Sequence, residues 1–271
     1  MPSNVKNMKK IAFQGIPGAY SHLACLNLYK DIESMPCSSF EEMIFSVQQG
    51  RADLAMVPVE NSTAGRVADI HHLLPDSGLF IIAEYFLRVH HMLLGTNKST
   101  IKSLKEVRSH GQGIAQCKKG LLKYKLKSSI HPDTAGAARE IAELKNPEIG
   151  AIASELAAEI YGLKVLKRNF EDANHNTTRF LIMSKDMTQY SLDASDLITT
   201  LVFKVRSIPA ALYKSLGGFA SNGVNLTKLE SYVHPQGFNV AQFYIDFEGH
   251  PENESVKLAL EEMKFFCKQM N

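Results

Sequence analysis

The sequence contains few cysteines and no long apolar run. Its cysteines, Cys25, Cys37, Cys117 and Cys267, are widely spaced and form no CxxC pair, which is typical of reduced thiols in a cytoplasmic protein rather than of a disulfide frame or a zinc site. No stretch approaches the roughly 18 apolar residues of a membrane span. The polar start MPSNVKNMKK has no apolar core of a secretory leader. We therefore predict a cytoplasmic protein that does not enter a membrane.

Excess charge is also small. A formal net charge of +2 over 271 residues gives no reason to expect a nucleic acid or an acidic membrane as partner. One stretch is more basic and holds Glu106 as its single acidic residue. Its cations are Lys98, Lys102, Lys105, Arg108, Lys118, Lys119, Lys123, Lys125 and Lys127. This stretch is either a solvated helix face or a rim that attracts a small anionic substrate.

The common catalytic signatures are missing as well. The sequence has no GxSxG, no plausible Ser-His-Asp set, no P-loop and no paired catalytic cysteine. The pairs His71-His72 and His90-His91 do not predict a metal site, because adjacent side chains diverge on a helix and on a strand. His110 follows a turn and is more typical of a surface or core histidine than of a catalyst.

Short β-like runs alternate with helical ones through the first two-thirds of the chain, which predicts an α/β fold with largely parallel sheets. The predicted strands are 9–15 and 53–61, and the predicted helices are 19–30, 40–50, 65–74, 112–124, 133–144 and 154–162.

The apolar run 79–95 exceeds the 3–10 residues usual for one strand. We interpret it as a strand that leaves one lobe and enters a second, with a return near residues 163–172, so that NTTRFLIM (176–183) completes the first lobe. Two lobes crossed twice create a cleft, and ligand pockets prefer such interfaces.

The pattern changes after the polar segment 185–197, which we interpret as a linker. Strand 199–207, helix 208–223, a hairpin of 225–233 and 238–249, and an amphipathic helix 254–270 give the order β-α-β-β-α. This is one strand short of the ferredoxin-like repeat.

Two polar segments follow predicted strands. GIPGAYS (15–21) offers backbone N–H groups at a helix start, a place for a carboxylate or phosphate, or is a plain turn. In VPVENSTAGRV (57–67), Glu60, Asn61, Ser62 and Thr63 lie at the edge of the sheet where α/β proteins bind ligands. Ser62 or Thr63 is alternatively only a helix cap.

Thr178, Arg179 and Phe180 combine a neutral hydroxyl, a permanent cation and an apolar wall. In a regular strand, Thr178 and Phe180 share one face and Arg179 has the other. Either the three residues precede the regular strand, or Arg179 has a structural role while Thr178 faces the cleft. To this point the residues predict a two-lobed cleft for a small anion and a small C-terminal module.

Several motifs in register resemble those of the prephenate dehydratase family: GIPGAYSHLA, VPVENSTAGRV, SHGQGIAQC, DTAGAA, ASELAAEIYGLKVL and NTTRF. NLTKLES and FYIDFEGH resemble the ACT regulatory domain of that family. The resemblance covers the chain from Lys9 onward. It implies an α/β two-lobed catalytic domain like the periplasmic binding proteins (type II), followed by an α+β ferredoxin-like ACT domain.

The resemblance also implies boundaries. A dehydratase domain spans residues 8–186, with one lobe of 8–86 and 168–186 and another of 87–167. A linker spans 187–197, and the ACT domain spans 198–271.

The resemblance implies conversion of prephenate into phenylpyruvate in phenylalanine biosynthesis, without a metal or organic cofactor. It makes Thr178 the essential threonine. Arg179 would then hold carboxylate charge of the substrate, and Phe180 would pack against the substrate ring. The substrate-binding residues implied are Ser21, Glu60, Asn61, Ser62, Thr63 and Asn176. The implied phenylalanine site, at a subunit interface of a homodimer or homotetramer, contains Ala210, Ala211, Leu212, Asn225, Leu226, Glu230 and Ser231.

Three departures from the family pattern stand out. Gly111 replaces the usual proline of SHPQ, Ala210 replaces the glycine of GAL, and Ser231-Tyr232-Val233 replaces the end of ESRP. The last two put the strength of phenylalanine feedback in question. We also expect the final ACT strand to be missing, since the chain ends at Asn271 after the last predicted helix.

Two other functions compete with this one. Arogenate, which has an amino group on the side chain, could replace prephenate as substrate. A non-catalytic amino-acid sensor would be expected to lack the threonine of TRF or the Glu-Asn-Ser segment, and both are intact here.

Overall fold

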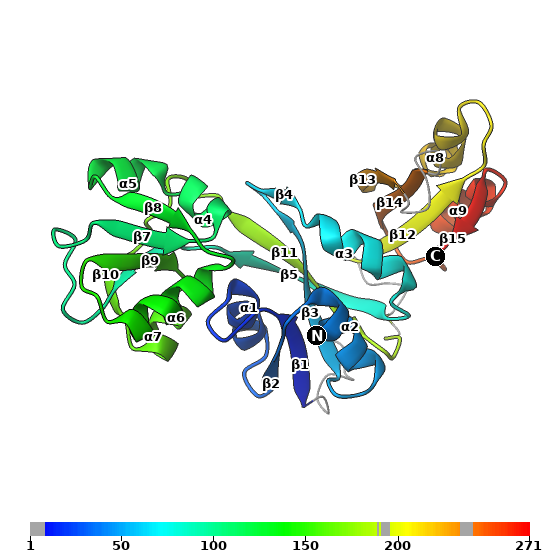
Figure 1. Cartoon of the computed structure of the whole chain (residues 1–271). Coiled ribbons are helices and arrows are strands. Elements are labelled where there is room, and N and C mark those ends of the chain that lie inside the picture. The colour runs from blue at the N-terminus through cyan, green and yellow to red at the C-terminus, as the bar shows by residue number, and fades with distance from the viewer. Residues whose placement is uncertain (1–8, 189, 191–195, 234–240) are drawn as a thin grey trace. The chain divides into compact units, whose positions relative to one another are not determined.

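The computed structural model describes residues 9–188, 190, 196–233 and 241–271. The chain divides into two compact units, residues 1–187 and residues 188–271. Figure 1 shows the helices and strands of both. Most of the predicted linker 187–197, and the turn of the predicted hairpin, lie outside the described residues.

The first sheet of the N-terminal unit has the order β2-β1-β3-β11-β5, and β4 pairs with β3. β1 is parallel to β2 and β3, whereas β11 is antiparallel to β3 and β5. The strands are β1 (Lys10–Gln14), β2 (Glu33–Cys37), β3 (Leu54–Asn61), β4 (Gly65–Arg66), β5 (Phe80–Arg88) and β11 (Thr177–Ser184).

The second sheet has the order β10-β6-β9-β7-β8. β7 is parallel to β8 and β9, and β6 is antiparallel to β9 and β10. The strands are β6 (Met92–Gly95), β7 (Glu106–Ser109), β8 (Lys127–Ile130), β9 (Ile149–Ala153) and β10 (Lys164–Lys167).

The apolar run 79–95 is divided between the two sheets. It supplies β5 to the first and β6 to the second, with Val89–His91 between them, and the chain returns from β10 to β11. Because each passage between sheets adds an antiparallel neighbour, both sheets are mixed, and the prediction of largely parallel sheets is wrong.

Helices cover both sheets, and polar side chains cap several of them. Ser39, Asp133 and Ser154 accept hydrogen bonds from the first turns of α2, α6 and α7. The helices of this unit are α1 (Tyr20–Leu28), α2 (Phe40–Gln48), α3 (Ala68–Leu73), the 3-10 helix η2 (Leu74–Asp76), α4 (Gly111–Ala115), α5 (Lys118–Lys123), α6 (Thr134–Leu144) and α7 (Glu155–Tyr161).

Two predicted helices differ from the structure. Residues 65–66 form β4 rather than the start of a helix, since Gly65 has a φ of +81° and pairs with Asn61. The predicted helix 112–124 is two short helices, α4 and α5, separated by Gln116 and Cys117. This break gives Gln116 its place in the site described below.

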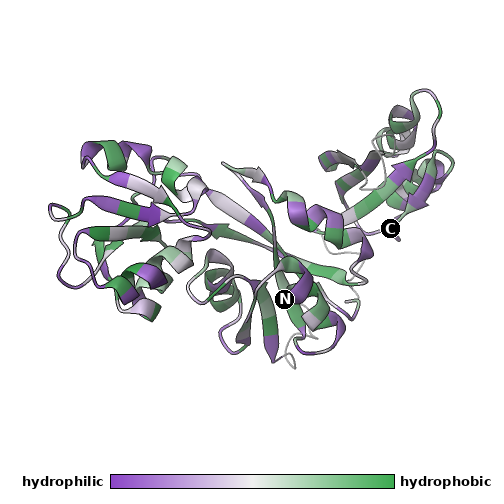
Figure 2. Ribbon diagram, viewed as in Figure 1, coloured by the Kyte–Doolittle hydropathy of each residue, from purple (hydrophilic) through white to green (hydrophobic). Residues whose placement is uncertain are grey.

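Each lobe has its own apolar core, visible as hydrophobic strands in Figure 2. Ile11, Phe13, Leu54, Phe180 and Ile182 are buried together in the first lobe. The second lobe buries one cluster against α6 and α7, which includes Leu94, Ala137, Ile141, Ala151 and Ala157. Because each lobe buries its apolar side chains in its own core, the strand ends between the lobes can carry polar side chains that face a ligand.

The C-terminal unit is a four-stranded antiparallel sheet of order β13-β14-β12-β15, with two helices. Phe203, Phe219, Phe247 and Met263 lie in its core. The elements are β12 (Ile198–Val205), α8 (Ala211–Ser221), β13 (Leu226–Val233), β14 (Ala241–Glu248), α9 (Glu254–Lys264) and β15 (Cys267–Met270).

The prediction that the final strand is missing is wrong. α9 ends at Lys264, and β15 pairs with β12, with Met270 opposite Phe203. The order is therefore β-α-β-β-α-β, the ferredoxin-like arrangement. In the sequence, β15 resembles a continuation of the helix, because its extended structure depends on pairing with a strand more than 60 residues away.

Ala210, at the N-cap of α8, has a left-handed backbone with a φ of +56°. Because glycine adopts this conformation without steric conflict, Ala210→Gly should raise the free energy of unfolding by about 0.5–1 kcal/mol. The measurement is urea denaturation of the full chain. The control Ala211→Gly, inside the first turn, should lower the stability by about 1 kcal/mol. Shifts of the same sign for both variants would contradict this.

Candidate active site

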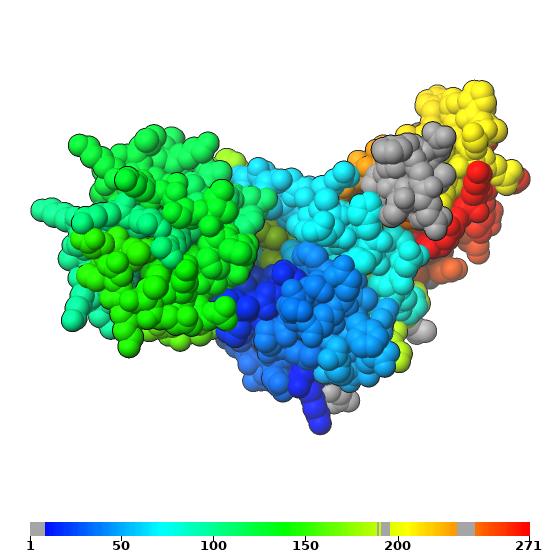
Figure 3. Space-filling model, in the orientation of Figure 1, coloured from blue at the N-terminus to red at the C-terminus, as the bar shows by residue number. Residues whose placement is uncertain are grey.

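A cluster of neutral polar side chains lies where β3 ends and the antiparallel strand β11 begins. The register places Asn61 opposite Thr178, and Asn61 Nδ2 donates to Thr178 Oγ1 at 3.0 Å. In the space-filling view, yellow-green atoms of the β11 region are recessed between the green lobe and the blue lobe (Figure 3). The ends of these strands are therefore at the junction of the lobes.

The backbone sets the orientation of Asn61. Its Oδ1 accepts hydrogen bonds from the backbone N–H groups of Thr63 and Ala64, at 3.0 and 2.9 Å, and from Thr63 Oγ1 at 2.8 Å. This Asx turn fixes which end of the carboxamide points back to the chain. Asn61 Nδ2 must then be the end that points to Thr178 and to Asn176 Oδ1, the latter at 2.7 Å.

Gln116 joins this cluster from the second lobe. Its Nε2 donates to Thr63 Oγ1 at 2.6 Å, and its Oε1 accepts from Asn176 Nδ2 at 2.8 Å. Asn176 is 2% exposed, so its carboxamide is held without competition from water. Gln116 is not among the site residues predicted from the sequence. The available signal was the second glutamine of the SHGQGIAQC motif, four residues after Gln112.

Thr178 has an asymmetric hydrogen-bonding environment. Its Oγ1 accepts from Asn61, and no acceptor for its own hydrogen lies within hydrogen-bonding distance in the described part of the chain. A hydroxyl that is already an acceptor for the protein can donate to a ligand.

Ser62 and Glu60, the two other predicted residues of the 60–63 segment, contact other parts of the chain than Thr178. Ser62 Oγ donates to the backbone oxygen of His175 at 2.8 Å and accepts from Thr177 N at 3.0 Å, so Ser62 ties the loop to the start of β11. Glu60 lies opposite Arg66 in one ladder and opposite Arg179 in the other.

The structure resolves the question raised by the TRF triplet. All three residues lie in β11, and a bulge in the pairing with β3 falls between Arg179 and Phe180. Arg179 Nε donates to Glu84 Oε2 at 2.8 Å on the neighbouring strand. Phe180 is 1% exposed inside the first core, so it supports the strand from behind rather than forming a wall against a ligand.

The GIPGAYS turn contacts the second lobe. Gly18 O accepts from Ser154 Oγ at 2.6 Å, and Pro17 O accepts from Tyr161 Oη at 2.7 Å. A Cβ at Gly18 would lie 2.9 Å from Ala157 Cα, which explains the glycine. Ser21 follows in α1, and its side chain makes no hydrogen bond to the described residues.

The cysteines are buried thiols, and His110 caps a helix. Burial raises the pKa of Cys25 to about 12 and the pKa of Cys267 to about 11, so both thiols are protonated at neutral pH. Within residues 9–188, 190, 196–233 and 241–271, no group of three His, Cys, Asp or Glu residues is arranged to hold a metal ion. His110 caps α4 by accepting from Gln112 N.

The lysines of the basic stretch are exposed, and Arg108 pairs with Glu106 and Glu140.

Gly111, the position where the family pattern has proline, is the first residue of α4. His110 has φ −59° and ψ 146°, the extended geometry that a following proline requires, and a Cβ at Gly111 would meet nothing within 4 Å. Gly111→Pro should therefore raise the free energy of unfolding by about 0.4–1 kcal/mol, measured by thermal denaturation. Gly113→Ala is the control and should destabilise, because its Cβ would lie 2.8 Å from Ser109 Oγ. A loss of stability in Gly111→Pro would contradict the prediction.

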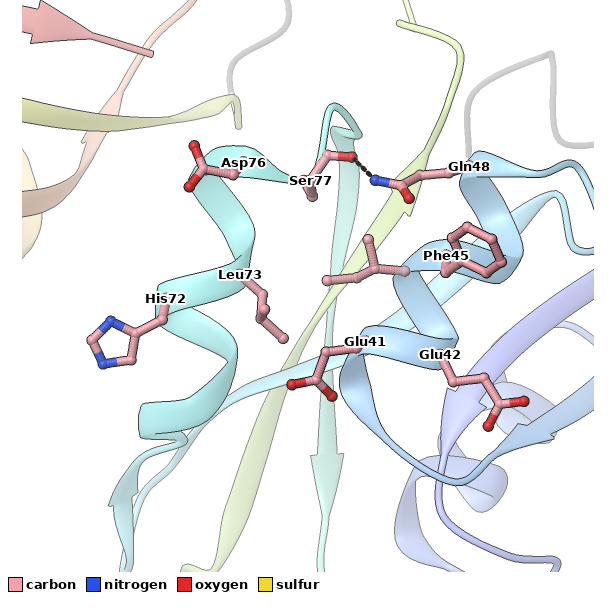
Figure 4. A pocket seen from close by; sticks show the side chains of 9 residues that line it. Glu41, Glu42, Phe45, Gln48, His72, Leu73, Asp76 and Ser77 are labelled. Atoms are coloured by element: carbon pink, nitrogen blue, oxygen red, sulfur yellow. Dashed lines mark hydrogen bonds between the residues drawn. The ribbon is translucent and has the colours of Figure 1, made fainter. Parts of the chain in front are cut away.

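A separate hollow of about 570 Å³ lies between α2 and α3. Its lining includes Phe45, His72, Leu73 and Asp76, and Gln48 Nε2 donates to Ser77 O at 2.7 Å across one end (Figure 4). None of the predicted site residues lines it. The polar cluster at the lobe junction is therefore the better candidate for chemistry.

Neutral hydrogen-bonding groups between two α/β lobes define a class of small-molecule-binding proteins and enzymes that orient a polar ligand through amides and hydroxyls. Within that class, the chain belongs to the prephenate dehydratase family, whose model matches residues 11–188. This confirms the resemblance found in the sequence and places the chain among proteins of phenylalanine biosynthesis.

Individual relatives agree with the family. The bifunctional N-acyl-homoserine lactone acylase/prephenate dehydratase of Komagataeibacter europaeus is 48% identical over 259 residues, which are 96% of this chain and 92% of the relative. Arogenate dehydratase 2 of Petunia hybrida is 36% identical over 272 residues, 95% of this chain and 69% of the relative. The crystal structure of prephenate dehydratase from Arthrobacter aurescens in complex with L-Phe has a TM-score of 0.88 and 27% identity, and the match covers 97% of this chain and 88% of that one.

None of the helices in the described part of the chain is both long enough and apolar enough to cross a membrane.

Proposed function

We propose that this chain converts prephenate into phenylpyruvate. The C–C bond to the ring carboxylate breaks to release carbon dioxide, its electron pair enters the ring, and the 4-hydroxyl leaves with one added proton as water. Aromatisation provides the driving force, so the protein needs to bind, orient and assist the leaving hydroxyl.

The observation that carries this proposal is the hydrogen bond from Asn61 to Thr178. Because Asn61 donates to Thr178 Oγ1, the hydroxyl hydrogen of Thr178 is available to the departing oxygen. Asn176, Thr63 and Gln116 hold Asn61 in this orientation. Arg179 and Phe180 support the strand through Glu84 and the core. Thr178 is thus the residue that we assign to the chemistry, as direct donor or as part of a relay.

Phenylpyruvate formation from prephenate by the purified chain, followed by absorbance in alkali, tests this function. Arogenate should be assayed in parallel, because the Petunia relative is named for that substrate. An N-acyl-homoserine lactone should also be assayed as a substrate, because the Komagataeibacter relative is named as an acylase of that compound as well. No turnover of prephenate or arogenate, with phenylalanine still bound, would favour the sensor.

We also propose that the C-terminal unit is an ACT domain that binds phenylalanine between copies of the chain, in a homodimer or homotetramer. Ala210, Ala211 and Leu212 lie at the start of α8, and Glu230 and Ser231 lie on the edge strand β13. The remaining proposed contacts are Asn225 and Leu226. An exposed edge strand can pair with a second copy. Inhibition of turnover by added phenylalanine tests this proposal.

The domain boundaries proposed are 8–186 for the dehydratase domain, 187–197 for the linker and 198–271 for the ACT domain. The division of compact units after Met187 supports them. The two passages between sheets, β5 to β6 and β10 to β11, support the proposed periplasmic-binding-protein-like (type II) arrangement of the first domain.

A further inference from the structure

His91 connects the two lobes through both of its ring nitrogens. It is 3% exposed and lies between β5 and β6, where the chain passes from one sheet to the other. His91 Nδ1 is 2.7 Å from Tyr20 Oη on α1, in the first lobe. His91 Nε2 is 2.7 Å from Gln116 Oε1, in the second lobe.

The direction of each hydrogen bond in the cluster follows from two backbone amides. Thr63 N and Ala64 N donate to Asn61 Oδ1, so Asn61 Nδ2 must donate to Asn176 Oδ1. Asn176 Nδ2 is then the atom that donates to Gln116 Oε1. Gln116 Oε1 is therefore fixed as an acceptor, and Gln116 Nε2 as a donor to Thr63 Oγ1.

This polarity determines the tautomer of His91. Because Gln116 Oε1 only accepts, His91 Nε2 must carry a hydrogen, and in the neutral ring Nδ1 then accepts from the hydroxyl of Tyr20. Burial lowers the pKa of His91 and raises the pKa of Tyr20, which keeps the ring neutral and the hydroxyl protonated. His90 O, 3.0 Å from Tyr20 Oη, is a second acceptor for the same hydroxyl hydrogen, and the contact to His91 Nδ1 is the shorter of the two at 2.7 Å. Glu171 Oε2 accepts from His91 N at 2.8 Å.

We propose that His91, with its tautomer held by Tyr20, is a positioning residue that fixes the carboxamide of Gln116 for the dehydration reaction. Gln116 Nε2 carries two hydrogens and donates one of them to Thr63 Oγ1. The second hydrogen has no acceptor among the described residues and is therefore available to the ligand. Without His91 Nε2–H, the carboxamide of Gln116 keeps two of its three hydrogen bonds, those to Asn176 and Thr63, and is held less firmly. The proposal rests on the proposed function, since it assigns Gln116 to that site.

A double-mutant cycle tests whether His91 acts through Gln116. The shorter amide of His91→Asn cannot reach Gln116, and kcat/KM for prephenate should fall about tenfold or more. His91→Gln places an amide donor near the former Nε2 and should recover most of the loss. The double variant His91→Asn/Gln116→Ala should be no worse than Gln116→Ala, within about twofold. Losses that multiply, or unchanged kcat/KM in His91→Asn, would overturn the proposal.

Two further measurements keep the test decisive. If His91→Asn fails to fold by circular dichroism, Tyr20→Phe replaces it in the same cycle, with the same expectation of non-additive losses. ¹⁵N NMR of labelled histidine in the intact chain reads the tautomer without any turnover, and His91→Gln identifies the signal. A neutral ring protonated at Nε2 supports the proposal, and protonation at Nδ1 overturns it. An inactive chain with the expected tautomer would refute the proposed function while leaving the His91–Gln116 contact in place.

Discussion

Replacing Thr178 by alanine is expected to lower kcat/KM for prephenate about 100- to 1000-fold, the effect of removing one hydrogen-bond donor from the reacting oxygen. The hydroxyl of Thr178 accepts from Asn61 and has its hydrogen left for the substrate. Steady-state kinetics of phenylpyruvate formation is the measurement. The loss should appear mainly in kcat, because the departing hydroxyl develops negative charge in the transition state more than in the bound substrate.

Two variants control this prediction. Thr178→Ser keeps the hydroxyl and should retain most of the activity. Thr177→Ala removes the neighbouring threonine side chain, which makes no hydrogen bond within the described residues, and should leave kcat/KM within a few-fold of the wild type. Full activity in Thr178→Ala would refute the assigned role of Thr178, whereas equal losses in Thr177→Ala would indicate a general disturbance of β11.

Asn61→Asp is expected to reduce kcat/KM about 100-fold or more, although the two side chains have the same shape. One carboxylate oxygen can still accept from Thr63 N and Ala64 N. The other would face Asn176 Oδ1 and Thr178 Oγ1, where the protein now has a donor. The Thr178 hydroxyl would turn its hydrogen to the carboxylate and away from the substrate, so the reaction would lose its donor.

The matched control for this variant is Asn174→Asp, which introduces the same charge at an exposed position outside the cluster. It should leave kcat/KM unchanged within about twofold, since exposed charges interact weakly. If both variants lose activity equally, the effect comes from added negative charge near the dianionic substrate. If Asn61→Asp stays fully active, the direction assigned to the Asn61–Thr178 hydrogen bond is wrong.

The sequence by itself determined the family, the two-lobed α/β class and most of the elements. Alternation of apolar and polar residues, helix caps such as Asp133 and glycine turns are local features that neighbouring residues encode. The polar segment that ends β3 was also recognisable, because polar residues after a buried strand mark the ligand edge of a sheet. The segment that begins β11 was recognisable from its polar residues directly before an apolar run. Asn61, Thr63 and Thr178, predicted from those segments, lie in one cluster in the structure.

Only the tertiary structure decided which of these side chains meet, and in which direction. Asn61 and Asn176 are 115 residues apart, Thr63 and Gln116 are 53 apart, and Tyr20 and His91 are 71 apart. Phe180 entered the core and Arg179 paired with Glu84 because a bulge and a neighbouring strand set the faces of β11. β15 likewise required β12 beside it. The physical reason is common to all of them: strand pairing and buried hydrogen bonds take their energy from partners distant in the chain, which no local pattern of residues records.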